Sequence, residues 1–178
     1  MYILISLLIL LFLAGIIILQ QDKFGASPSG ERLERIKRSR NYRDGKFQNL
    51  RPTPSLAEGY SYAGIMYDFL FGKKDGVVPR EELPFIRTDL KSLPPDKDVL
   101  VWFGHSSYLL QLEGKTLLVD PVLSGYASPF SGMNKAFKGA DTYKVEDLPE
   151  IDYLLITHDH YDHLDHETIT RLKEKVGK

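Results

Sequence analysis

The sequence of 178 residues contains no cysteine, so it forms no disulfide bond, and any metal site must be built from His, Asp or Glu side chains. It also lacks a surplus of either charge, because 23 basic residues are balanced by 24 acidic residues and the formal net charge is −1. A general nucleic-acid binder needs a basic surplus, so the balance predicts no nucleic-acid partner. The length suits about one domain with a sizeable core.

Charge is missing altogether from residues 2–19, a run of 18 residues near the N-terminus. As a helix this run would be roughly 27 Å long, close to the hydrocarbon core of a bilayer at about 30 Å. A cleaved signal peptide and a buried core helix are the alternatives. However, no Lys or Arg precedes Lys23, and Leu19-Gln-Gln-Asp22 is a poor cleavage site. We therefore expect residues 1–22 to be a single transmembrane anchor in the lipid bilayer.

The residues that follow are basic, which predicts the orientation of this anchor. Positive flanks stay on the cytoplasmic side, so we expect the body of the protein in the cytoplasm, at a bacterial inner membrane. The same cluster could rest on anionic head groups or form a solvated stalk. Seven basic side chains lie between residues 20 and 43: Lys23, Arg32, Arg35, Lys37, Arg38, Arg40 and Arg43.

Composition then divides the chain into a linker and a domain. Residues 23–95 are rich in Gly, Pro and polar side chains and predict a juxtamembrane linker with an N-terminal extension, in which residues 31–40 and 60–71 favour helices. Residues 96–178 predict an α/β layered domain. Its strands are expected at 99–103, 108–112, 116–119 and 152–157, with a hairpin turn at 113–115 and a final helix over 165–176 capped by Asp165.

The stretch THDHYDH, residues 157–163, places three of the five histidines directly after the last predicted strand. His158 and His160 alternate to one side, so both imidazoles can converge on one divalent cation, while Asp162 and His163 point to a neighbouring position. A polar helix start would be the ordinary explanation for one histidine, but crowded imidazoles repel one another when protonated unless a metal orders them. Imidazole and carboxylate ligands suit zinc, and also manganese or iron.

The motif His158-x-His160-x-Asp162-His163 resembles the signature of the metallo-β-lactamase-fold hydrolases. Over residues 88–176, the segments at 102–107, 119–124, 127–129 and 148–152 resemble the branch that contains N-acylphosphatidylethanolamine-hydrolysing phospholipase D and a bacterial lactonase. The resemblance implies an αβ/βα sandwich with two divalent metal ions between its sheets. It places His158 and His160 on the first metal, and Asp162 and His163 on the second.

The resemblance also implies a reaction in which a hydroxide held by the two metals attacks phosphorus or a carbonyl carbon, with Asp162 orienting that water or accepting its proton. His105 and Asp120 are weaker predictions. His105 matches a Gly-His turn near the family's metal site, with a structural turn as the alternative. Asp120 matches a strand-end aspartate that supports ligands more often than it binds metal.

The family pattern needs a third histidine, a bridging aspartate and a last histidine downstream, and none follows His166. We therefore expect this chain to hold the first half of the sandwich, with an apolar sheet face lacking its cover. We expect it to be inactive by itself and to bind metal poorly. Homo-oligomerisation stays open.

The predicted function is that of a membrane-anchored metal-dependent hydrolase acting on a phosphodiester of a phospholipid-like substrate. Two alternatives remain. One is a lactonase or another hydrolase of the same fold acting on a soluble substrate, and the other is a non-catalytic metal-binding or assembly module.

Overall fold

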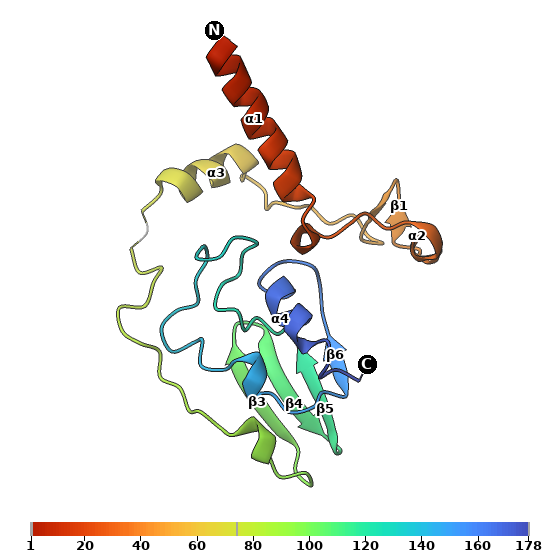
Figure 1. Cartoon of the computed structure of the whole chain (residues 1–178), viewed down its shortest axis with the longest axis vertical. Coiled ribbons are helices and arrows are strands. Elements are labelled where there is room, and N and C mark those ends of the chain that lie inside the picture. Colours follow the sequence, from red (N-terminus) through yellow and green to blue (C-terminus); the bar gives the residue numbers. More distant parts are fainter. Residues whose placement is uncertain (1, 74, 178) are drawn as a thin grey trace. The chain divides into compact units, whose positions relative to one another are not determined.

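The computed structural model describes residues 2–73 and 75–177. These residues divide into two compact units, Met1–Asp75 and Gly76–Lys178 (Figure 1). The domain was predicted to begin at residue 96, whereas the second unit also takes in residues 76–95 of the expected linker. A hydrogen bond from the Leu83 amide to the Lys138 carbonyl, at 2.9 Å, is one contact that ties this segment to the domain.

The first unit begins with the apolar helix α1 (Tyr2–Leu19), none of whose side chains is buried. Its mean hydropathy is 3.1, and its length and composition allow it to cross a membrane. A helix with these properties near the N-terminus is consistent with a membrane anchor and with a signal sequence. The predicted apolar helix is therefore present.

The remainder of the first unit consists of short elements. The helix expected at 31–40 is shorter than predicted. A hairpin of two strands, each two residues long, occurs where only a loop was expected. The helix expected at 60–71 begins two residues late, because the Ser61 hydroxyl caps it by accepting the amide of Gly64 at 3.1 Å. The elements are η1 (Asp22–Phe24), α2 (Gly30–Lys37), β1 (Tyr42–Arg43), β2 (Lys46–Phe47) and α3 (Tyr62–Phe71).

The second unit is built on a four-stranded sheet of order β3-β4-β5-β6. The first two pairs are antiparallel and the last pair is parallel. The turn between β4 and β5 has positive φ at Glu113 (48°) and Gly114 (73°), which a tight hairpin requires, so the predicted turn is confirmed. The strands are β3 (Val99–Gly104), β4 (Ser107–Leu112), β5 (Lys115–Val119) and β6 (Tyr153–Leu155).

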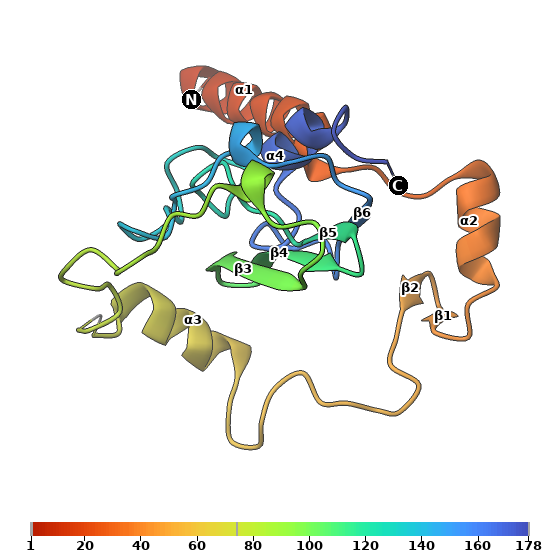
Figure 2. The same ribbon diagram turned by 90° about the horizontal axis from the view of Figure 1, so that it is seen from below.

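One face of this sheet carries the core. In Figure 2 helix α4 (His166–Leu172) and the short turns η2 (Leu90–Ser92) and η3 (Val145–Asp147) lie on the same side of the sheet. Leu109, Leu118 and Leu172 are completely buried there. As predicted, Asp165 caps α4, its carboxylate accepting the Glu167 amide at 3.1 Å, but the helix ends at Leu172 instead of continuing to 176.

The opposite face of the sheet is apolar and open within this unit. Leu100 and Trp102 on β3 keep 60% and 65% of their surface exposed, and Leu155 on β6 keeps 46%. Alternation along each strand explains the difference, because neighbouring side chains point to opposite faces. The predicted exposed apolar face is therefore present among the described residues.

Candidate metal centre

The histidine-rich residues meet at one edge of the sheet. Because β5 and β6 are parallel, their carboxyl ends lie side by side, so Asp120 after β5 adjoins Thr157 after β6. The Asp120 amide extends the pairing by donating to the Leu155 carbonyl at 2.9 Å. The β3–β4 turn that carries His105 lies at the same edge, since Tyr108 at the start of β4 pairs with Val119 at the end of β5.

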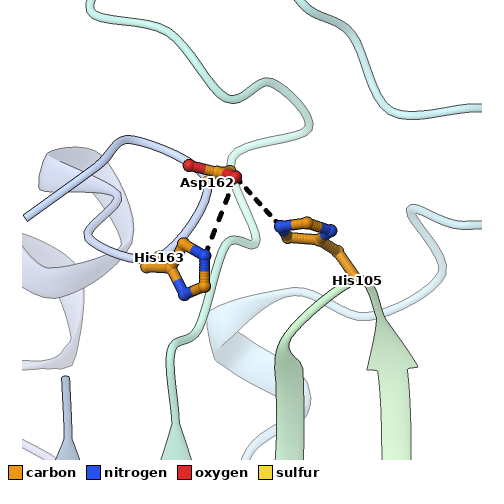
Figure 3. Close-up of side chains that lie close together, drawn as sticks. All are labelled: His105, Asp162 and His163. Atoms are coloured by element: carbon orange, nitrogen blue, oxygen red, sulfur yellow. Dashed lines mark hydrogen bonds and ion pairs between the residues drawn. The ribbon is translucent and has the colours of Figure 1, made fainter. Parts of the chain in front are cut away.

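Three side chains converge there, as Figure 3 shows: His105, Asp162 and His163, here called the ligand cluster. Their ligand atoms all lie within 4.8 Å of one another. The His105 Nε2 atom is 2.9 Å from Asp162 Oδ2, and the His163 Nε2 atom is 3.7 Å from the same oxygen. Two imidazoles and one carboxylate at this spacing are a donor set that suits zinc, iron or manganese.

The structure places the other predicted ligands next to this cluster. The ring centroid of His158 is 3.8 Å from that of His163, and the ring of His160 is 4.7 Å from that of His158. His160 also lines an open hollow with Asp159 and Asp162. Of the four ligands predicted from the motif, Asp162 and His163 are therefore in the cluster, whereas His158 and His160 flank it.

Asp120 supports the cluster by contacting His163, and its side chain is only 1% exposed. Its carboxylate accepts the Thr157 amide at 2.8 Å, the Thr157 hydroxyl at 2.7 Å and His163 Nδ1 at 2.8 Å. Burial raises the pKa of Asp120, but the hydrogen bonds from His163 and Thr157 outweigh burial and leave the pKa below its usual value. Asp120 is therefore a carboxylate, which can only accept hydrogen bonds.

This network determines which ring nitrogen of His163 and which of His158 donates a hydrogen bond. Since Asp120 only accepts, His163 must donate from Nδ1, and in the neutral ring this tautomer leaves the lone pair on Nε2. The Thr157 hydroxyl has one proton and donates it to Asp120, so it accepts from His158 Nδ1 at 3.1 Å. The neutral ring of His158 then likewise has its lone pair on Nε2. A carboxylate that fixes the tautomer of a histidine in this way is the usual support of a metal ligand, so the residues present fit a metal site.

Burial and hydrogen bonding act in opposite directions on Asp162. Burial raises its pKa, but hydrogen bonds from its own backbone amide and from His105, together with the electrostatic interaction with nearby His163, lower the pKa on balance. Asp162 is therefore ionised and can offer an anionic oxygen to a cation.

Unusual backbone geometry marks two of these positions. His105 and Asp120 adopt positive φ angles of 46° and 42°, which non-glycine residues seldom do. Each is held there by its neighbours: the indole of Trp102 donates to the His105 carbonyl at 2.9 Å, and the Ser107 hydroxyl donates to the Asp120 carbonyl at 2.6 Å. Such strain concentrates at functional sites.

Thr157 was not singled out from the sequence, although its position directly before the histidine motif was a usable signal. Replacing it with valine keeps its shape and removes the hydroxyl, so His158 and Asp120 each lose a partner. We expect Thr157→Val to weaken metal binding about 10-fold, the lower end of the range for losing such a support. Competition with a chromogenic chelator would measure this. Thr157→Ser, which keeps the hydroxyl, is the control, and equal losses in both variants would contradict the role of the hydroxyl.

Comparison with known proteins gives a family for part of the chain. Residues 99–176 match the model described as Beta-lactamase superfamily domain. An uncharacterized protein of Mycobacterium tuberculosis is 31% identical over 134 residues, which are 75% of this chain and 36% of the relative. N-acyl-phosphatidylethanolamine-hydrolyzing phospholipase D 1 of Caenorhabditis elegans is 32% identical over 129 residues, covering 57% of this chain and 35% of the relative. Further relatives are described as metal-dependent hydrolases.

Among solved structures, the diiron β-hydroxylase CmlA of Streptomyces venezuelae is 41% identical, with a TM-score of 0.34, over 48% of this chain and 15% of that one. The chain spans about a third of the length of the first curated relatives that it matches. The family match covers all four strands of the sheet, the turn with His105 and the loop with Asp162 and His163. Residues 99–176 are therefore similar to the Beta-lactamase superfamily domain, and the relatives of the chain include proteins described as metal-dependent hydrolases.

Proposed function

We propose that the protein carrying this chain is a membrane-anchored hydrolase that uses two divalent metal ions to cleave a phosphodiester of a phospholipid-like substrate. The convergence of His105, Asp162 and His163 within 4.8 Å, at the end of the paired strands, is the observation that carries the proposal. The substrate class is supported by similarity to the Caenorhabditis elegans phospholipase and by the apolar N-terminal helix. The likeness to other metal-dependent hydrolases leaves lactone hydrolysis as the alternative.

Each side chain has a proposed task. His158 and His160 are proposed to hold one cation, and Asp162 and His163 the other. A divalent cation held here would lower the pKa of water to about 7 and so supply a nucleophile at neutral pH. Asp162 is proposed to accept the proton of the attacking water on Oδ2, while His105 at 2.9 Å orients this carboxylate. Asp120 holds His163 in the tautomer that leaves Nε2 free.

The experiment that tests this function compares Asp162→Asn with the wild type in the natural protein, embedded in lipid. Asp162 is 43% exposed, so the change should leave folding intact while removing the proton acceptor. We expect turnover of N-acylphosphatidylethanolamine to fall at least about 100-fold, and strong chelator to abolish the wild-type turnover. Asp159→Asn, in the same loop, is the control. Full activity in chelator would contradict the metal-dependent reaction, and no turnover by the metal-loaded wild type would favour a non-catalytic module.

The metal is proposed to be zinc. Iron is the alternative, because nitrogen and oxygen ligands suit both ions and one relative is described as a diiron hydroxylase. Elemental analysis of the protein purified without added metal distinguishes them. Bound iron together with oxygen consumption would favour a hydroxylase, whereas zinc with phosphodiester turnover would favour the hydrolase.

The location is proposed to be the bacterial inner membrane, with the second unit in the cytoplasm. The basic residues that follow α1 support this orientation. A reporter that is active only in the cytoplasm, fused after residue 178, would test it, and a silent reporter in an intact, expressed fusion would reverse the proposed topology.

A further inference from the structure

A cavity of about 410 Å³ opens beside the ligand cluster, within the range of about 300–1,000 Å³ typical of small-molecule sites. His105 and Asp162 form part of its wall, so the cavity is continuous with the candidate metal centre. The rest of the lining is mainly apolar and comes from the end of β3, from Ser107 at the start of β4, from residues 122–141 and from Leu83. Trp102, Phe137 and Ala140 are among these apolar residues.

The wall of this cavity is already formed by hydrogen bonds within the loop between β5 and β6. The Ala136 amide donates to the Gly125 carbonyl at 2.9 Å, and the Ala127 amide donates to the Asn134 carbonyl at 3.0 Å. The Tyr126 hydroxyl then ties this loop to α4 by donating to Glu167 Oε2 at 2.7 Å. A ligand entering the cavity would therefore not have to order the loop, which favours binding.

The charged residues of the loop favour an anionic ligand. The lining contains Lys135 and Asp141 from this loop. Asp141 is already neutralised by Lys144, whose Nζ lies 2.5 Å from Asp141 Oδ1. Within the part of the chain that the structure describes, Lys135 forms no ion pair. Lys135 is thus a cation without a carboxylate partner in the lining of an apolar cavity, while the Asp162 carboxylate of the same lining is bonded to His105. Such a cation suits an amphiphile with an anionic head.

We propose that this cavity binds the alkyl or acyl group of an amphiphilic phosphate ester whose head group lies at the ligand cluster. The proposal rests on the proposed hydrolase and extends it, because it assigns the selection of an apolar chain to Trp102, Phe137 and Ala140. A substrate lacking such a chain would leave the cavity filled with water and would lose the free energy of burying its methylene groups, about 0.8 kcal/mol each.

The single tryptophan makes this proposal directly measurable. Trp102 lines the cavity, so its fluorescence should report occupancy without any catalytic turnover. The whole chain, held in lipid nanodiscs with excess zinc, is titrated with n-hexyl phosphate and with methyl phosphate. We expect hexyl phosphate to bind at least 30-fold more tightly than methyl phosphate, since it buries five additional methylene groups.

Filling the cavity should remove this preference. We expect Ala140→Phe to weaken the binding of hexyl phosphate at least 10-fold. Its affinity for methyl phosphate should stay within threefold of the wild-type value. Ser131→Phe, on the same loop but outside the lining, is the matched control and should change neither ligand. If Ala140→Phe does not fold, Phe137→Asp serves instead, because Phe137 is 43% exposed and tolerates a polar side chain there.

The outcomes separate this inference from the proposed function. Equal affinities for the two phosphates, or unchanged hexyl phosphate binding in a folded Ala140→Phe protein, would contradict the proposal that the cavity binds an apolar chain. This holds even if the chain took up zinc normally. The expected hexyl preference in a chain that takes up no metal would support the cavity as an amphiphile site, whereas the hydrolase is decided by the Asp162→Asn experiment in the natural protein.

Discussion

Replacing Asp120 with alanine is expected to lower the free energy of unfolding by on the order of 3–5 kcal/mol, because three hydrogen-bond donors lose their acceptor at about 1–3 kcal/mol each. Asp120 is 1% exposed and accepts three hydrogen bonds, from the Thr157 amide, the Thr157 hydroxyl and His163. Without the carboxylate, these donors point at the buried position of Asp120 and have no acceptor there. A loss of this size should lower Tm by more than about 10 °C.

The same substitution should weaken metal binding by about 10–100-fold, because His163 loses the partner that fixes its tautomer. Thermal unfolding followed by circular dichroism measures the first effect, and chelator competition measures the second. Asp120→Asn separates them: it keeps the shape and one acceptor oxygen, so it should recover part of the stability but little of the metal affinity.

Asp159→Ala is the matched control, since it removes an exposed carboxylate from the same loop and should change stability by less than about 0.5 kcal/mol. A stability loss at Asp120 no larger than at Asp159 would show that the buried network does not hold this edge of the sheet together.

Local sequence patterns predicted most of the sheet. Short apolar runs between polar turns located β3, β4 and β5, and the Glu113-Gly114 turn predicted the antiparallel pairing of β4 with β5, because Gly114 readily adopts positive φ. Asp165 marked the start of α4 by its capping chemistry. Each of these features is encoded within a few neighbouring residues, so each can be recognised without knowing the fold.

The geometry of the metal centre could be predicted only in part. The spacing of His158, His160, Asp162 and His163 placed them in one loop, but His105 lies 57 residues before Asp162, and no local pattern brings the two together. Their 2.9 Å contact depends on the register of the whole sheet. The assignment of His158 and His160 as ligands stays a prediction.

The loop between β5 and β6 was the least predictable segment, because it has no periodic pattern. Its path depends instead on backbone contacts between distant segments, and Gly139 lies at one of them. A β-carbon at this position would lie 2.2 Å from the carbonyl oxygen of Leu83 and 3.0 Å from its amide nitrogen. Only glycine lets residues 76–95 pass so close to this loop.

Gly139→Ala is therefore expected to destabilise the second unit by about 2–5 kcal/mol. Its φ of 86° costs alanine about 1–2 kcal/mol, and forcing two backbone segments apart adds about 1–3 kcal/mol. Because Leu83 and Ala140 both line the cavity, the displaced segments should also reshape its wall. Thermal unfolding measures the stability, and the affinity of Gly139→Ala for hexyl phosphate reports the cavity.

Gly132 provides a control with the same backbone conformation. Its φ is also 86°, but a β-carbon there would meet only the flexible Lys135 side chain, at 3.6 Å. Gly132→Ala should therefore carry the conformational cost of about 1–2 kcal/mol without the collision. The difference between the two variants isolates the contact between Gly139 and Leu83. Equal stability losses would mean that residues 76–95 are not held against the loop. The assignment of Leu83 to the cavity wall would then be wrong.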